Sequence, residues 1–159
     1  MTAMYISLST DKTTKAKPLS QALSSMNFSK PIGSLYICGH SLGAAVATLL
    51  ALDIAHNNKD FPEPIVYTFA SPRVGGFLFA HIYNQSIQQN YRIFNPHDLV
   101  PKLPLPWPFL PYYVHVKGGF ILNQTNLEPN PIYQHSMSTY MNLLDKVNGV
   151  IIESTGSVD

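Results

Sequence analysis

Residues 35–52 read LYICGHSLGAAVATLLAL, and this stretch decides the fold of the chain. Residues 35–38 form a short unbroken apolar run, the pattern of a strand buried on both faces, so Cys38 is expected to be a small core side chain. The alanine- and leucine-rich residues after Ser41, up to about Asn57, predict a buried helix. The stretch therefore predicts a strand, a sharp turn and a helix in direct succession.

The turn carries a G-x-S-x-G sequence from Gly39 to Gly43, in the strand, turn and helix context that a nucleophile elbow requires. We expect both glycines to be necessary, because side chains two residues before and after Ser41 would collide with the neighbouring strand or helix. Ser41 then stands at the carboxyl edge of the sheet, and the backbone N–H of Leu42 is aimed at a developing oxyanion. Ser41 is the candidate nucleophile, and a Gly-Ser loop that only caps the helix is the alternative.

The alternation of strand and helix continues downstream of this unit. An apolar run at residues 65–70 predicts a second strand, followed by a helical pattern to about Asn90 and a third strand at residues 91–94. This order predicts a single α/β domain over residues 1–159, with a mostly parallel sheet and helices on both faces. The other candidate elements are a strand at 5–8 and a helix at 19–26 within the poorly defined residues 1–33, a hairpin of 114–116 and 120–122 joined through Gly118-Gly119, and a helix over 138–147.

A serine nucleophile needs a base, and the base needs an orienting carboxylate. In elbow-type sites the chain order is serine, acid, histidine. Asp98 directly follows a predicted strand, at the edge of a parallel sheet where such a site forms. His135 lies just before the last helix and is free to reach Ser41, whereas His115 alternates with valines in a strand. We predict Asp98 as the acid and His135 as the base; a turn-forming Asp98 and a helix-starting His135 are the alternatives.

The composition excludes several kinds of partner. Ten basic and nine acidic residues give a formal net charge of +1, which provides no electrostatic footprint for nucleic acid. No metal-binding motif is found, so no metal or cofactor is expected. No secretion signal is visible, and the longest apolar run, residues 42–52, is too short to span a membrane. These observations predict a cytoplasmic protein.

Five segments, in this order along the chain, resemble one family. They are LYICGHSLGAAVATLLAL, YTFASPRVGG, RIFNPHDLVPKLP, YVHVKGG and HSMSTYM. Together they resemble the class 3, or fungal-type, triacylglycerol lipases of the α/β-hydrolase superfamily. The resemblance implies that Ser41 is the nucleophile, Asp98 the acid and His135 the base. It also implies that lipid esters are the substrates and that they are cleaved through an acyl-enzyme without a cofactor.

The chain departs from the family pattern in its N-terminal part. Residues 1–34 contain no arginine, so the aromatic-or-His-Arg-Gly loop that supplies the second oxyanion donor in the family is not found there. This predicts a partial α/β-hydrolase fold without the N-terminal strands and the lid region. Two functions stay open: a serine ester hydrolase that acts on lipids, and a catalytically weak or inactive fragment that binds acyl chains.

A proline-rich apolar loop follows the candidate acid. Its prolines, between residues 101 and 111, stiffen a segment that exposes Trp107, Phe109 and Leu110. Such a surface suits an acyl chain or a transient contact with a lipid interface. We predict these three side chains, together with His40 beside the nucleophile, as substrate-binding residues. A buried structural role for the loop is the alternative.

Overall fold

The computed structural model describes residues 33–57, 61–105, 112–122 and 129–147. The expected strand at residues 5–8, the expected helix at residues 19–26 and the candidate substrate-binding residues Trp107, Phe109 and Leu110 lie outside the described residues.

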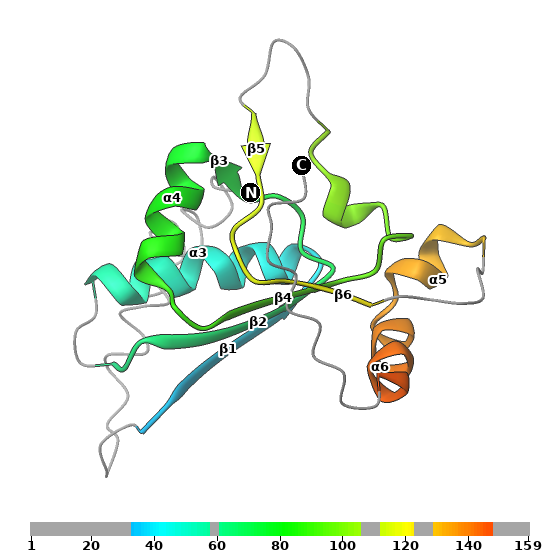
Figure 1. The fold of residues 1–159 in the computed structure, drawn as a ribbon, viewed down its shortest axis with the longest axis horizontal. Helices are drawn as coiled ribbons and strands as arrows, with labels where there is room; N and C mark the ends of the chain where they lie inside the picture. Colours follow the sequence, from blue (N-terminus) through cyan, green and yellow to red (C-terminus); the bar gives the residue numbers. More distant parts are fainter. Residues whose placement is uncertain (1–32, 58–60, 106–111, 123–128, 148–159) are drawn as a thin grey trace, which may run out of the picture.

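Strands and helices alternate along the described chain (Figure 1). In chain order they are β1 (Leu35–His40), α3 (Leu42–Asn57), β2 (Pro64–Phe69), β3 (Gly75–Gly76), α4 (Phe77–Ser86), β4 (Asn90–Phe94), the 3-10 helix η1 (Val100–Lys102), β5 (Tyr113–Val114), β6 (Gly119–Ile121), α5 (Pro131–His135) and α6 (Met137–Lys146). None of the described helices is long and apolar enough to cross a membrane.

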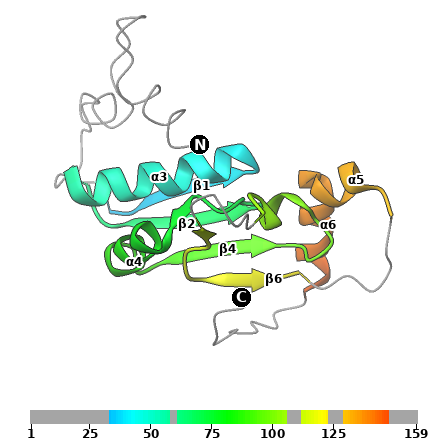
Figure 2. The ribbon, with the colours of Figure 1, turned by 90° about the horizontal axis from the view of Figure 1, so that it is seen from above.

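Four parallel strands form the main sheet, in the order β1-β2-β4-β6. His40 pairs with Phe69, Phe69 pairs with Ile93, and Phe94 pairs with Ile121 across neighbouring strands. The strands therefore end at one edge, and their arrows point towards α5 and α6 (Figure 2). Segments that leave the strands at this edge are brought close together, which is where parallel α/β sheets bind their ligands.

Helix α3 packs closely on β1 and β2 because its inner face consists of small side chains. Ala44, Ala45 and Ala51 are fully buried. Thr48 satisfies its buried hydroxyl by donating to the carbonyl oxygen of Ala44 at 2.9 Å. Helix α4 covers the same face of the sheet as α3 (Figure 1). The core cluster on this face consists of Ile37, Ala47, Ala51, Ile54, Val66, Ala80, Tyr83, Ile87 and Val116.

Helix α6 covers the opposite face of the sheet near its carboxyl edge. Tyr140 and Leu143 of α6 pack with Ile93 of β4 in a second core cluster. Strand β2 contributes side chains to both clusters, since Val66 belongs to the first and Tyr67 packs against the second. The prediction of a mostly parallel sheet with helices on both faces is confirmed.

The second face is open at β1, which corrects the prediction that residues 35–38 are buried on both faces. Ile37 is buried on the side of α3, whereas Tyr36 is 61% exposed and Cys38 is exposed as well. Successive strand residues point to opposite faces, and among the described residues nothing covers the face of β1 that carries these two side chains. Cys38 is therefore not a core side chain in this structure.

The predicted hairpin of residues 114–116 and 120–122 is wrong. Strand β5 pairs antiparallel with β3, outside the main sheet, while β6 pairs parallel with β4. Gly118 has a φ of 81°, in the left-handed region, and a Cβ at this position would overlap the carbonyl oxygen of Asn90. The glycine lets the chain pass along the start of β4 and enter the main sheet, so it does not turn back onto β5.

Ile54 tests the core between α3 and the sheet. Its side chain is 1% exposed, so Ile54→Ala removes buried apolar atoms and leaves a cavity. The free energy of unfolding, measured by urea denaturation, should fall by about 2–5 kcal/mol. The matched control is Ile132→Ala, at a position that is 82% exposed, where the change should stay within about 0.5 kcal/mol. Equal effects of the two substitutions would contradict this description of the core.

Candidate active site

Ser41 occupies a sharp turn between β1 and α3. Its φ of 57° lies in the left-handed region, and its backbone N–H donates to the carbonyl oxygen of Phe69 at 2.9 Å. A Cβ at Gly39 would overlap the carbonyl oxygen of Gly43, so the first glycine is needed for the close approach of strand and helix. A Cβ at Gly43 would meet nothing within 4 Å apart from its own helix, which corrects the prediction that both glycines are sterically necessary.

Asp98 lies in the loop that leaves β4 at the carboxyl edge. Its side chain is fully buried, with an exposure of 0%. The backbone of the loop holds it, because Asp98 N–H donates to the carbonyl oxygen of Asn95 at 3.0 Å and Val100 N–H donates to Oδ1 at 2.9 Å. The second carboxylate oxygen, Oδ2, is left to face the histidine.

His135 connects the carboxylate to the serine. It is the last residue of α5, and its side chain is 26% exposed. Nδ1 lies 2.9 Å from Asp98 Oδ2, and Nε2 lies 2.8 Å from Ser41 Oγ. Because a carboxylate only accepts hydrogen bonds, Nδ1 carries the proton in the neutral ring, and Nε2 is free to accept the proton of the serine hydroxyl. The structure thus brings together the three residues that the sequence singled out.

His40 lies beside the histidine of this chain of hydrogen bonds. Its Nε2 donates to the backbone carbonyl oxygen of His135 at 2.8 Å, and the two ring centroids are 4.9 Å apart. The contact fixes the end of α5 against the residue that precedes Ser41. A substrate-binding role for His40 stays a prediction, and the structure adds a contact that positions His135.

Tyr140 and Asn95 are parts of the site that the sequence did not reveal. The Tyr140 hydroxyl donates to Asp98 Oδ2 at 2.8 Å and accepts from the backbone N–H of Asn95 at 3.1 Å. Burial and the nearby Asp98 charge raise the pKa of Tyr140, so its hydroxyl stays protonated and remains a donor. The Asn95 side-chain amide donates to Gln134 Oε1 at 2.6 Å, next to His135. In the sequence, Tyr140 cannot be told from a residue that only packs the apolar face of a helix.

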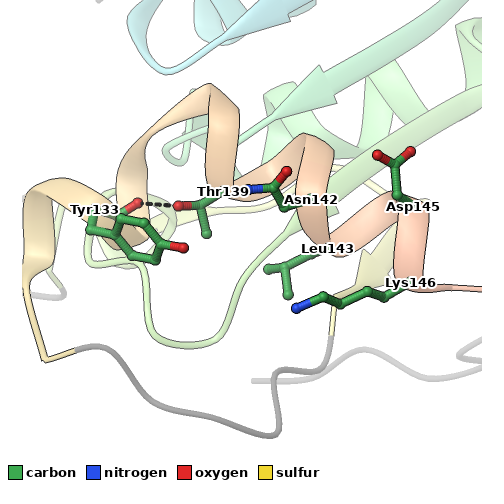
Figure 3. A pocket seen from close by; sticks show the side chains of 6 residues that line it. All are labelled: Tyr133, Thr139, Asn142, Leu143, Asp145 and Lys146. Carbon is green, nitrogen blue, oxygen red and sulfur yellow. Dashed lines mark hydrogen bonds between the residues drawn. The ribbon is translucent and has the colours of Figure 1, made fainter.

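The turn after His135 is held by hydroxyl groups. Ser136 caps α6 by accepting from the Thr139 N–H at 3.2 Å, and Thr139 Oγ1 donates to the carbonyl oxygen of Tyr133 at 2.7 Å. Figure 3 shows this second bond at one end of a pocket of about 380 Å³ along α6. Asp145 and Lys146 line the other end, and none of the candidate catalytic residues lines the pocket. These bonds join α5 to α6 and so fix the backbone next to His135.

The start of α3 faces the space beside Ser41. Leu42 is the first residue of the helix, and its backbone N–H donates to no acceptor among the described residues. This N–H, at the positive end of the helix dipole, is placed to receive negative charge on a substrate oxygen. A second donor in such sites comes from an earlier loop, and residues 1–32 lie outside the described residues. Among the described residues, no group of three or more His, Cys, Asp or Glu could hold a metal ion.

The fold and the site define a domain of the α/β-hydrolase type with the arrangement of a serine hydrolase centre. Residues 2–107 match the family model described as Lipase (class 3), and the chain belongs to this family. The match contains Ser41 and Asp98 but ends before His135, so the assignment of the base rests on geometry. It also includes most of the N-terminal residues in which no family motif was found.

Three known proteins illustrate the similarity. The chain is 42% identical over 96 residues to the secreted mono- and diacylglycerol lipase A of Penicillium cyclopium, covering 60% of this chain and 30% of that protein. It is 40% identical over 109 residues to the secreted mono- and diacylglycerol lipase 1 of Fusarium solani, covering 68% of this chain and 31% of that protein. The solved structure of a triacylglycerol lipase, whose catalytic centre is described as a serine protease triad, gives a TM-score of 0.52 at 31% identity. The match covers 57% of this chain and 34% of that structure. The chain thus spans about 30% of the length of the two secreted relatives.

The prediction of a cytoplasmic protein is contradicted by these comparisons. Both named relatives are described as secreted. The prediction rested on finding no signal in the first residues and no span of membrane length. Net charge and fold do not distinguish a secreted hydrolase from a cytoplasmic one, so nothing else in the residues supported the choice of compartment.

Tyr140→Phe tests whether the buried hydroxyl supports the site. The substitution removes the hydrogen bond from Tyr140 to Asp98 Oδ2, and loss of a hydrogen bond to a charged group costs about 1.5–3 kcal/mol. The carboxylate that orients His135 is then held less firmly. We expect kcat for a soluble p-nitrophenyl ester to fall about tenfold or more, with KM little changed. The matched control is Tyr133→Phe, whose ring is 40% exposed. A Tyr140→Phe variant that is folded and as active as this control would contradict the role.

Proposed function

We propose that this chain is a serine carboxylic ester hydrolase that acts on lipid esters through an acyl-enzyme. The observation that carries the proposal is the continuous hydrogen-bond chain from buried Asp98 through His135 to Ser41. A serine, an imidazole and an orienting carboxylate in this geometry are the parts that nucleophilic acyl transfer requires. Ser41 acts as nucleophile, His135 as general base and acid, and Asp98 as the residue that orients His135.

The first half of the reaction transfers the acyl group to the protein. Ser41 Oγ attacks the ester carbonyl carbon while its proton passes to His135 Nε2, which lies 2.8 Å away. Asp98 stabilises the imidazolium that forms, because Oδ2 already bonds Nδ1. The carbonyl oxygen becomes negative and is received by the Leu42 N–H at the start of α3. His135 then gives its proton to the leaving alcohol, and the C–O bond of the ester breaks.

The second half of the reaction releases the acid. His135, again neutral, takes a proton from a water molecule that attacks the acyl carbon of the Ser41 ester. The tetrahedral intermediate collapses when the proton passes from His135 to Ser41 Oγ, which frees the carboxylic acid. Each step needs the His135 ring to hold its position, which the contacts with His40 and Asp98 provide.

Lipid esters are the substrate class that the similar proteins favour. The two named relatives are mono- and diacylglycerol lipases, and the solved structure is that of a triacylglycerol lipase. We extend this class to the present chain as part of the proposal, and on the same ground we propose that the protein acts outside the cell. A transient contact with a lipid interface through Trp107, Phe109 and Leu110 stays a prediction.

A serine-directed fluorophosphonate probe tests the proposal, since it reacts only with an activated serine. We expect labelling of the unmodified chain and loss of labelling in Ser41→Ala, and hydrolysis of a p-nitrophenyl ester should fall at least about 10³-fold in Ser41→Ala and His135→Ala. The matched control is Ser34→Ala at an exposed position before β1, which should react like the unmodified chain. A folded chain that is neither labelled nor active would contradict the proposal and favour the alternative of a fragment that binds acyl chains without turnover. If Ser41→Ala is still labelled, another serine is the nucleophile.

A further inference from the structure

A cleft separate from the serine lies along β4 and β6, beside α4. Its volume is about 1150 Å³, somewhat above the range of about 300–1,000 Å³ typical of small-molecule sites. Figure 2 shows β4 and β6 side by side, next to α4. Of the three candidate catalytic residues only Asp98 lines the cleft, while Ser41 and His135 do not. Its walls carry the apolar and aromatic side chains Phe77, Phe94, Tyr112, Tyr113, Val114 and Val116.

Four cationic side chains line this cleft although they are far apart in the sequence. They are Arg73, Arg92, Lys102 and Lys117. The only described carboxylate that lines it is that of Asp98, whose two oxygens already accept from Val100, His135 and Tyr140. Among the described residues, the cations of the cleft therefore have no acid to balance them.

Arg92 is the partly buried centre of this group. Its guanidinium carbon lies 4.8 Å from the centroid of the Phe94 ring, and its Nε donates to the carbonyl oxygen of Val116 at 3.4 Å. Neither Nη atom has an acceptor among the described residues. A Cβ at Gly119 would lie only 2.9 Å from Nη2, so the absent side chain leaves the room that the guanidinium occupies. Both Nη nitrogens of this cleft-lining guanidinium thus keep their N–H donors available to a ligand.

The charge on Arg92 persists without a counter-ion. Burial, together with the charge of Arg73, lowers the pKa of Arg92 to about 10, so the guanidinium is still protonated at neutral pH. Burial and the charge of Arg92 lower the pKa of His115 to about 3, so that ring is neutral. Arg73 donates to the backbone carbonyl oxygens of Lys102 and Pro104, which are neutral acceptors. Partial burial of a cation without a partner charge is unfavourable, and an anionic ligand would offset this cost.

We infer that this cleft binds an amphiphile with an oxyanion head, a carboxylate or a phosphate, seated on Arg92. The guanidinium fork matches the two oxygens of such a head, and Lys102 adds long-range attraction at the mouth. The apolar and aromatic walls receive the hydrocarbon chain. Fatty acids released by ester hydrolysis and phosphate-bearing lipids share this chemistry, so the test separates the two head groups.

The test is calorimetric titration of the full chain with three single-chain ligands, the two anions below their critical micelle concentrations and the alcohol below its solubility limit. Dodecanoate and dodecyl phosphate carry the two oxyanion heads, and dodecanol is the neutral control with the same chain. We expect one site, and at least one of the two anions should bind about tenfold or more tightly than dodecanol. The anion that binds more tightly identifies the preferred head group. Dodecanol that binds as tightly as both anions would overturn the inference. None of the ligands is a carboxylic ester, so this result does not depend on the proposed acyl-transfer activity of Ser41.

Variants locate the binding to the cleft. Arg92→Gln should weaken binding of the preferred anion about tenfold or more, and Arg92→Lys, which keeps the charge but loses the fork, should weaken it less. Lys102→Gln, at an exposed position, should weaken binding about two- to threefold. This variant tests whether the anion binds in the cleft if Arg92→Gln does not fold. The matched control is Lys146→Gln, an exposed lysine at the end of α6 and outside the cleft, which should change nothing. Losses of equal size in Lys102→Gln and Lys146→Gln, or full affinity in a folded Arg92→Gln, would overturn the inference.

Discussion

The buried carboxylate of Asp98 is the interaction on which the site and the adjoining helices depend. It has no exposure to solvent and accepts hydrogen bonds from Val100, His135 and Tyr140. These donors come from the start of η1, from the end of α5 and from the middle of α6. A buried charge is tolerated only when it is paired and hydrogen-bonded, and loss of one partner of such a pair costs about 3–5 kcal/mol. Formation of the site and docking of α6 on the sheet are therefore coupled.

The strained serine depends on the same edge of the sheet. Ser41 holds a φ of 57°, and a residue in this region stores about 1–3 kcal/mol of strain. The bond from its N–H to Phe69 and the close packing of α3 over Gly39 offset this strain. Because β1, β2 and β4 run parallel and end together, the strained turn and the buried carboxylate lie within reach of one imidazole. Sheet register thus sets the geometry on which the proposed chemistry rests.

Much of the fold could be predicted from periodicity and much of the site from order along the chain. The strand, turn and helix around Ser41 are local, and the position of Asp98 after a strand follows from the parallel sheet. The pairing of β6 with β4 was missed because it depends on the conformation of Gly118, which pattern does not reveal. Tyr140 was missed because its hydroxyl matters only once α6 has docked. The cationic cleft was missed for a similar reason, since Arg73 and Lys117 line one cleft only in the folded chain.

The phosphonylation rate of an Asp98→Asn variant tests the central claim most directly. The asparagine keeps the shape of the side chain, but it removes the charge that holds the proton on His135 Nδ1 and replaces one of the two acceptor oxygens by an NH2 group. In a well-studied serine protease the equivalent change lowers turnover about 10⁴-fold. The account predicts that the rate of Ser41 labelling falls by about 10³-fold or more while the circular dichroism spectrum of the folded chain is retained. A folded Asp98→Asn variant that is labelled within tenfold of the unmodified rate would contradict the claim that this carboxylate organises the site.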